Sequence, residues 1–255
     1  MSPLPTPRHW ALILLHSAFA IGVFAEPAQP PRLRFLFIDE TAGAYSIKTD
    51  NSYRQISSAP YAISSEFTPT DQKNIEIYKT DPVASTPEKT IRVKIASIPP
   101  PVTTPAALFI LTPRAQTPGS TTPALHTVEM IEDDARAAPA GSLRILNRGQ
   151  VTMAAQIGPD TITAEPGDTQ VLRPATDHRH RVRIKIAAPG QDGWTLIDDR
   201  IVKVRANSRM TGVFVFSPSG MSHTYPEDEL LARGPPPPGH FWLTYTDTPP
   251  TPPSP

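Results

Sequence analysis

Apolar and polar residues alternate over short runs along most of this chain, and this spacing predicts β-strands rather than helices. The clearest case is Thr90–Ala96, where Ile91, Val93 and Ile95 share one face and two basic residues share the other. After residue 25 no stretch keeps a helical period over about eleven residues. Turn-forming residues recur about every ten residues, which is typical of β-sandwiches.

The same pattern predicts about seven short strands in each half of the chain, with Leu125–Ile131 as one further candidate in the first half. In the first half we expect them at Leu33–Ile38, Tyr45–Lys48, Tyr53–Ile56, Tyr61–Ser65, Asn74–Tyr78, Thr90–Ala96, Ala107–Leu111 and Leu125–Ile131. In the second half we expect them at Leu143–Leu146, Val151–Gln156, Thr161–Ala164, Gln170–Leu172, Arg181–Ala188, Trp194–Ile197, Ile201–Val204 and Thr211–Phe216.

One strand sequence occurs twice, which indicates an internal repeat. Thr90–Ala96 reads T-I-R-V-K-I-A and Arg181–Ala187 reads R-V-R-I-K-I-A. Three further pairs of segments follow in the same order and support the match: Leu33–Ile38 with Leu143–Leu146, Thr68–Asp71 with Glu165–Asp168, and Leu108–Pro113 with Val213–Pro218.

The repeat predicts an all-β protein with two tandem immunoglobulin-like β-sandwich domains and a disordered, proline-rich C-terminal tail. The expected limits are a signal peptide at 1–25, a first domain at 26–131, an acidic linker at 132–141, a second domain at 142–220 and the tail at 221–255. The tail contains Pro235–Pro238 and ends T-P-P-T-P-P-S-P, a composition with too little apolar surface to fold.

The first 25 residues resemble a secretory signal peptide. A weakly basic start at Arg8 precedes the mostly apolar Trp10–Phe24, and Val23-Phe24-Ala25 offers a cleavage site. The alternative is a membrane anchor, but the apolar run is shorter than the roughly 20 residues that span a bilayer. We therefore expect a secreted or periplasmic protein cut after Ala25, with no stable membrane span once the signal is removed.

Charge and composition exclude several classes of function. The chain carries 24 basic and 24 acidic residues, a balance that does not attract nucleic acid or anionic lipid. It contains no cysteine, which excludes disulfides and thiol chemistry. Its 33 prolines cluster at the ends of apolar runs and in the tail, where they terminate strands.

No residue pattern identifies a catalytic, cofactor or metal site. Asp177–His180 places two histidines on one strand face, but Arg179 and Arg181 beside them would repel a cation. Glu132–Asp134 lacks the spacing of a calcium loop and favours a plain acidic linker. Ser217–Gly220 with His223 lacks a nucleophile elbow, and Asp198–Arg200 favours a hairpin tip.

The aromatic segment near the C-terminus is the candidate docking site for a partner. Phe241, Trp242 and Tyr245 follow a run of prolines, as in short linear motifs that dock into a groove or add a strand to an exposed sheet edge. The alternative is that His240–Tyr245 folds back as a final strand of the second domain.

The order of several segments resembles a group of uncharacterised exported bacterial proteins of verrucomicrobial type with two β-rich repeats. The segments are an opening strand at Leu33, the junction Glu132–Asn147, the turn Glu165–Pro174 and Asp192–Ile197. The resemblance implies the fold, an extracytoplasmic location and a buried Trp194, and it implies no catalytic residue.

Together these observations predict a non-enzymatic structural or protein-interaction module of the cell envelope, with no cofactor. Its partner would be another envelope protein or a glycan. The alternative is a carbohydrate- or peptide-binding module that serves an envelope assembly. An enzyme would need a pocket with perturbed titratable groups, and a binding module would need an apolar patch or an unpaired strand edge.

Overall fold

The computed structural model describes residues 30–39, 43–50, 52–57, 59–69, 73–86, 88–99, 104–114, 125–221, 229, 231, 234 and 237–249. The expected signal peptide, His223 and part of the proline run at 235–238 lie outside these residues. Nowhere in the described part of the chain is there a helix with the length and apolar character needed to cross a bilayer.

The described residues form fifteen strands. The first half contains β1 (Arg32–Phe37), β2 (Tyr45–Thr49), β3 (Ser52–Ser57), β4 (Ile75–Thr80), β5 (Arg92–Ile98), β6 (Ala106–Pro113) and β7 (His126–Glu132). The second half contains β8 (Leu143–Arg148), β9 (Met153–Ile157), β10 (Asp160–Ala164), β11 (Thr169–Leu172), β12 (Arg181–Gly190), β13 (Gly193–Lys203), β14 (Arg209–Ser217) and β15 (Gly239–Asp247).

Both halves have the same topology. In the second half the sheets have the orders β11-β8-β14-β15 and β10-β9-β12-β13. In the first half the orders are β1-β6-β7 and β3-β2-β4-β5, and bridges from Leu33 to Phe67 and from Leu36 to Ile63 place a short segment where β11 lies in the second half. In each half the first strand runs parallel to its neighbour, β1 to β6 and β8 to β14. The prediction of an all-β chain with two tandem β-sandwiches is confirmed.

The repeated strand sequence, however, does not mark equivalent strands. The topology equates β5 with β13, both at the edge of a sheet, and β4 with β12, both inside one. The match between Thr90–Ala96 in β5 and Arg181–Ala187 in β12 is therefore a similarity of pattern only. Alternation specifies a half-buried strand and carries no information on its place in a sheet. Two other sequence matches do connect equivalent strands. They are Leu33–Ile38 in β1 with Leu143–Leu146 in β8, and Leu108–Pro113 in β6 with Val213–Pro218 in β14.

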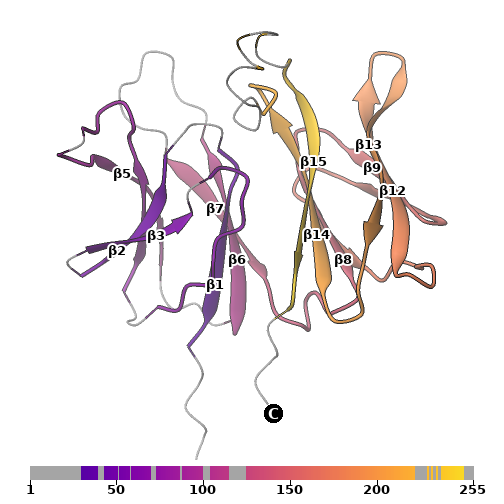
Figure 1. Ribbon diagram of the computed structural model, residues 1–255, viewed down its shortest axis with the longest axis horizontal. Helices are drawn as coiled ribbons and strands as arrows, with labels where there is room; N and C mark the ends of the chain where they lie inside the picture. Colours follow the sequence, from indigo (N-terminus) through magenta and orange to yellow (C-terminus); the bar gives the residue numbers. More distant parts are fainter. Residues whose placement is uncertain are drawn as a thin grey trace, which may run out of the picture.

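Four sheets stack side by side along the long axis of the molecule (Figure 1). The two inner sheets contain β1 and β6 on one side and β8 and β14 on the other. These strands are nearly continuous apolar runs, as in AALFILTP of β6, because each inner sheet is covered on both faces. The outer sheets alternate: in β12 Val182, Ile184, Ile186 and Ala188 are buried between exposed or half-buried residues.

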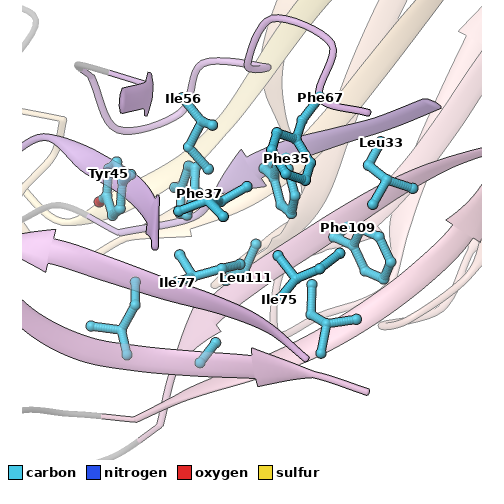
Figure 2. Close-up of a cluster of buried hydrophobic side chains, with 14 of the residues drawn as sticks. Leu33, Phe35, Phe37, Tyr45, Ile56, Phe67, Ile75, Ile77, Phe109 and Leu111 are labelled. Atoms are coloured by element: carbon cyan, nitrogen blue, oxygen red, sulfur yellow. The ribbon is translucent and has the colours of Figure 1, made fainter. Parts of the chain in front are cut away.

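The core of the first domain is rich in aromatic rings from β1, β2 and β6. Figure 2 shows Phe35, Phe37 and Phe109 among branched side chains from β4. The rings of Phe37 and Tyr45 stack with centroids 3.7 Å apart, and those of Phe35 and Phe109 lie 5.7 Å apart. Such pairs add specific geometry to apolar burial. The contact of Phe37 with Tyr45 joins the two sheets of this domain, whereas Phe35 and Phe109 are neighbours within one sheet.

A third apolar cluster joins the two domains. It contains Leu36, Leu108 and Ile110 from the first domain with Leu146, Val213 and Val215 from the second, all at most 1% exposed. Domains move relative to each other unless their interface is large and hydrophobic. We infer that this contact fixes the two sandwiches as one body.

A network of buried charges closes the same interface at one end. Asp133, whose side chain is 1% exposed, lies 2.6 Å from Arg34 Nη2, 3.0 Å from Arg144 Nη1 and 2.7 Å from Arg209 Nη2. Asp247 pairs with Arg209 through two contacts of 3.0 Å and also with Arg34. Asp133 belongs to the segment 132–141, which was expected to be a plain acidic linker. In the structure its carboxylate is buried and contacts three guanidinium groups.

Several expected elements differ in the structure. The proposed hairpin tip Asp198–Arg200 lies inside β13, which continues through it with an irregular register near Ile197. The pairing of β5 with β4 changes register between Ile77 and Tyr78 of β4. The alternation in β5 is therefore interrupted: Ile95 and Ala96 are both buried, and Ile91 and Val93 are half-buried. Trp194, expected to be buried, is 56% exposed.

The C-terminal segment is also corrected. Gly239–Asp247 forms β15 and pairs with β14 along its whole length, so this part of the chain is a strand of the second sandwich and not a disordered tail. The prediction of a disordered tail was wrong for this segment. Composition alone counts too few apolar residues for an independent fold, but pairing with β14 supplies backbone hydrogen bonds to the whole segment.

Candidate functional site

The candidate site is a groove at the open side of the first sandwich, between the edge strands β5 and β7. Its volume is about 730 Å³. Its apolar lining consists of Ala96, Ile98, Pro99, Phe109, Leu125, Val128 and Met130, and its polar lining of Lys94, Ser97, Arg114 and His126. The groove is therefore mainly apolar, with basic groups around it.

Val128 and Met130 show why the groove is open. In the register of β6 and β7 they lie opposite Leu111 and Phe109, so their side chains share the face that carries the domain core. Yet Val128 is 36% and Met130 48% exposed, and Leu125 at the start of β7 is 54% exposed. β5 and β7 are the edge strands of the two facing sheets, and the groove lies between them.

The second domain shows how the same position is filled when it is closed. β6 is equivalent to β14 and β7 to β15, and Leu111 of β6 is equivalent to Phe214 of β14. Val128 pairs with Leu111, and Trp242 pairs with Phe214, so Val128 corresponds to Trp242. Trp242 is 4% exposed and belongs to the core of its own domain. Its ring covers Gly212, where an added methyl would lie 1.9 Å from Trp242 Cζ2. In the first repeat the position of Gly212 is taken by Phe109, so a phenyl ring stands where the second repeat leaves room for the indole of Trp242, and Val128 is the smaller residue beside it.

A buried polar cluster forms one end of the groove. His126 Nε2 lies 3.1 Å from Asp39 Oδ2, and Lys79 Nζ lies 2.7 Å from the same oxygen. The side chains of His126 and Asp39 are 3% and 6% exposed. Burial, followed by the charge of Asp39, raises the pKa of the neighbouring Tyr45 hydroxyl, which stays protonated. The cluster satisfies its own charges and positions His126 at the groove wall.

The rim of the groove is basic. Lys94 Nζ lies 2.5 Å from Glu76 Oε1 on the neighbouring strand, which neutralises this cation. Arg114 is exposed and makes no ion pair with any residue that the structure describes. A partner with an acidic group beside an apolar segment would match this arrangement of charges.

The predicted docking residues are engaged within the chain. Trp242 lies in the core of the second domain, and Phe241 and Tyr245 pack against the apolar cluster between the domains. The hydroxyl of Tyr245 donates to the backbone carbonyl of Tyr61 in the first domain. The segment adopts the alternative that the sequence left open, a final strand, with Trp242 buried and Phe241 and Tyr245 partly buried.

The other sequence candidates have structural roles. Asp177 accepts hydrogen bonds from the backbone of Arg181 and Arg179, which with the Arg181 side chain lower its pKa to about 2. Ser217 Oγ accepts the backbone N–H of Met221 at 2.6 Å. Among the described residues there is no group of three or more His, Asp or Glu side chains that would hold a metal ion.

Sequence reasoning missed the groove and the charge network. A signal for the network was present: Leu33-Arg34 and Leu143-Arg144 place an arginine inside a buried strand in both repeats. A buried arginine requires a carboxylate partner, which would have drawn attention to Asp133. The groove left no comparable signal, because it depends on where β7 lies relative to β5.

Comparison with protein families and with curated proteins gives no match. The function is therefore argued from the geometry of the groove.

Proposed function

We propose that this chain is an exported, non-enzymatic protein-interaction module of the cell envelope, and that the groove between β5 and β7 is its docking site. The ligand is an extended apolar segment of a partner protein. The observation that carries this proposal is the exposure of Val128 and Met130 on the core face of β7.

Two features of the groove support a peptide ligand. β5 is the last strand of its sheet, so its outer edge has backbone groups available to an added strand. Strand addition supplies affinity through main-chain hydrogen bonds and specificity through alternate side chains that enter pockets. Here the side chains would meet Phe109, Val128 and Met130, and an acidic residue would meet Arg114.

The chemistry of the lining favours a peptide over a glycan. Sugars bind through exposed aromatic faces and many polar groups, whereas the one aromatic ring in this lining, Phe109, is 2% exposed. Burial of apolar surface is the main source of affinity that such a lining offers. The extracytoplasmic location belongs to the proposal and is supported by the pattern of residues 1–25.

The proposal is tested with a phage-displayed library of random peptides selected on the mature protein. We expect enriched peptides with alternating large apolar residues and at least one Asp or Glu. Isothermal titration of a synthetic enriched peptide then compares the wild type with Met130→Glu, which places a charge in the groove. We expect the variant to bind at least about tenfold more weakly.

Val83→Glu is the matched control, because Val83 is 93% exposed on a turn of the same domain and does not line the groove. It should bind as the wild type does. Absence of enriched peptides, or equal binding to the wild type and Met130→Glu, would refute the docking site.

A further inference from the structure

The hairpin of β12 and β13 presents an apolar stripe to solvent on the second domain. Trp194, Leu196 and Ile201 are 56%, 57% and 65% exposed. They pair with Pro189, Ala187 and Arg183 of β12, whose side chains lie on the outer face of the sheet, while Ala188 and Ile184 between them are buried. Trp194 and Leu196 thus follow each other on one face of the strand, and Asp199, which forms an ion pair with Arg183, separates them from Ile201 on the same face. The described part of the chain does not cover these side chains.

This strand is also at the edge of its sheet. In the order β10-β9-β12-β13 its outer edge has no neighbouring strand among the described residues, and β5 has the same position in the first domain. Figure 1 shows β5 and β13 at opposite ends of the long axis, so they do not meet within one molecule. Two edge strands with complementary side chains can pair between molecules.

The apolar stripe carries the kind of side chain that an apolar groove buries. In the second repeat the position of Val128 is taken by Trp242, a large aromatic residue. Trp194 is an exposed tryptophan on an extended strand.

The charges match as well. Asp192 lies in the hairpin turn, two residues before Trp194, is exposed and has no basic partner among the described residues. Arg114 at the groove is exposed and equally without an acidic partner in the described residues. An unpaired acidic group beside the apolar stripe therefore complements an unpaired basic group beside the apolar groove.

We propose that the partner is a second copy of this chain, whose β13 docks beside β5 with Trp194 and Leu196 in the groove and Asp192 near Arg114. This inference rests on the proposed docking function of the groove. The contact joins two different surfaces, so it is head-to-tail, and repetition produces linear or ring-shaped assemblies rather than a closed two-fold dimer.

Sedimentation velocity of the mature protein, over about a hundredfold range of concentration, tests this inference. We expect the wild type to form species larger than a dimer as concentration rises. Met130→Glu, with a blocked groove, and the double variant Trp194→Ser, Leu196→Ser, with a blocked strand, should each stay monomeric. Val83→Glu should behave as the wild type does.

Mixing the two blocked proteins supplies the decisive result. The Met130→Glu protein keeps an intact strand and the double variant keeps an intact groove, so the mixture should form a heterodimer that grows no further. A two-fold contact between β13 strands predicts no such complementation. A monomeric wild type, or a mixture that stays monomeric, overturns the second copy as partner. The peptide selection does not depend on self-association. Enriched peptides with a monomeric wild type would therefore retain the groove as a docking site and refute only the second copy as its partner.

Discussion

Arg34 and Arg144 occupy equivalent positions in the two repeats, and both contact the same carboxylate, that of Asp133. Asp133 and Asp247 are also equivalent, because each lies at the end of the last strand of its repeat. Asp133 lies beside Ala106 and Asp247 beside Arg209, and these two neighbours are equivalent residues of β6 and β14. The interface between the domains is therefore built from duplicated residues, to which Arg209 adds a third guanidinium. The duplication supplies both the fold and the ion pairs that lock its two copies together.

Asp133 is predicted to be essential to the stability of the whole chain. Asp133→Asn removes the carboxylate that faces three buried or nearly buried arginines, and loss of one partner of a buried ion pair costs about 3–5 kcal/mol. Urea unfolding measures this change in the free energy of unfolding. The neighbouring Glu132→Gln is the control, since Glu132 is exposed. Similar midpoints for the two variants would show that the network contributes little.

Trp242 is predicted to be a core residue of the second domain. Trp242→Ala opens a cavity above Gly212 and should destabilise the protein by about 3–5 kcal/mol. Trp194→Ala, which removes an exposed indole, should leave the unfolding midpoint of the monomer nearly unchanged. Thermal unfolding at low protein concentration compares the two. A small effect of Trp242→Ala would mean that β15 is not held in the sheet.

Replacement by aspartate is predicted to destabilise the second domain strongly on the inner face of β12 and only slightly on its outer face. Ile184→Asp places an unpaired charge at a position with 0% exposure and should cost more than about 4 kcal/mol, enough to unfold the domain. Arg183→Asp, on the outer face, loses an exposed ion pair with Asp199 and should cost little. Circular dichroism and urea unfolding distinguish these outcomes, and equal effects would contradict the orientation of β12.

His240 is predicted to make the protein less stable in mild acid. Its ring stacks on Phe214, with centroids 5.1 Å apart, and burial lowers its pKa. The folded state therefore disfavours the protonated form, so stability is highest above the unfolded pKa of about 6.5 and falls as the pH drops below it. His240→Phe keeps the stacking and removes the titration. Its free energy of unfolding should depend less on pH between about 7 and 5 than that of the wild type, and unchanged pH dependence would refute the assignment.

Much of the local structure was predictable from residue patterns. Alternation in Arg181–Ala188 and the apolar runs at Leu33 and Leu143 placed strands close to where they are. The candidate site was not predictable. Phe241, Trp242 and Tyr245 attracted attention as an apolar island, but such an island is equally suited to a partner and to the chain's own core. The exposure of Val128 and Met130 depends on how the two sheets of the first domain pack on each other, which no short segment encodes.

The sequence by itself determined the all-β class, the division into two sandwiches and the positions of nearly all strands, because side-chain alternation and turn residues act over a few neighbours. The tertiary structure alone decided which strands are equivalent, that Asp133 is a buried anchor, that Gly239–Asp247 completes a sheet and that the first sandwich is open beside β7. These properties depend on contacts between residues far apart in the chain, and local pattern does not specify such contacts.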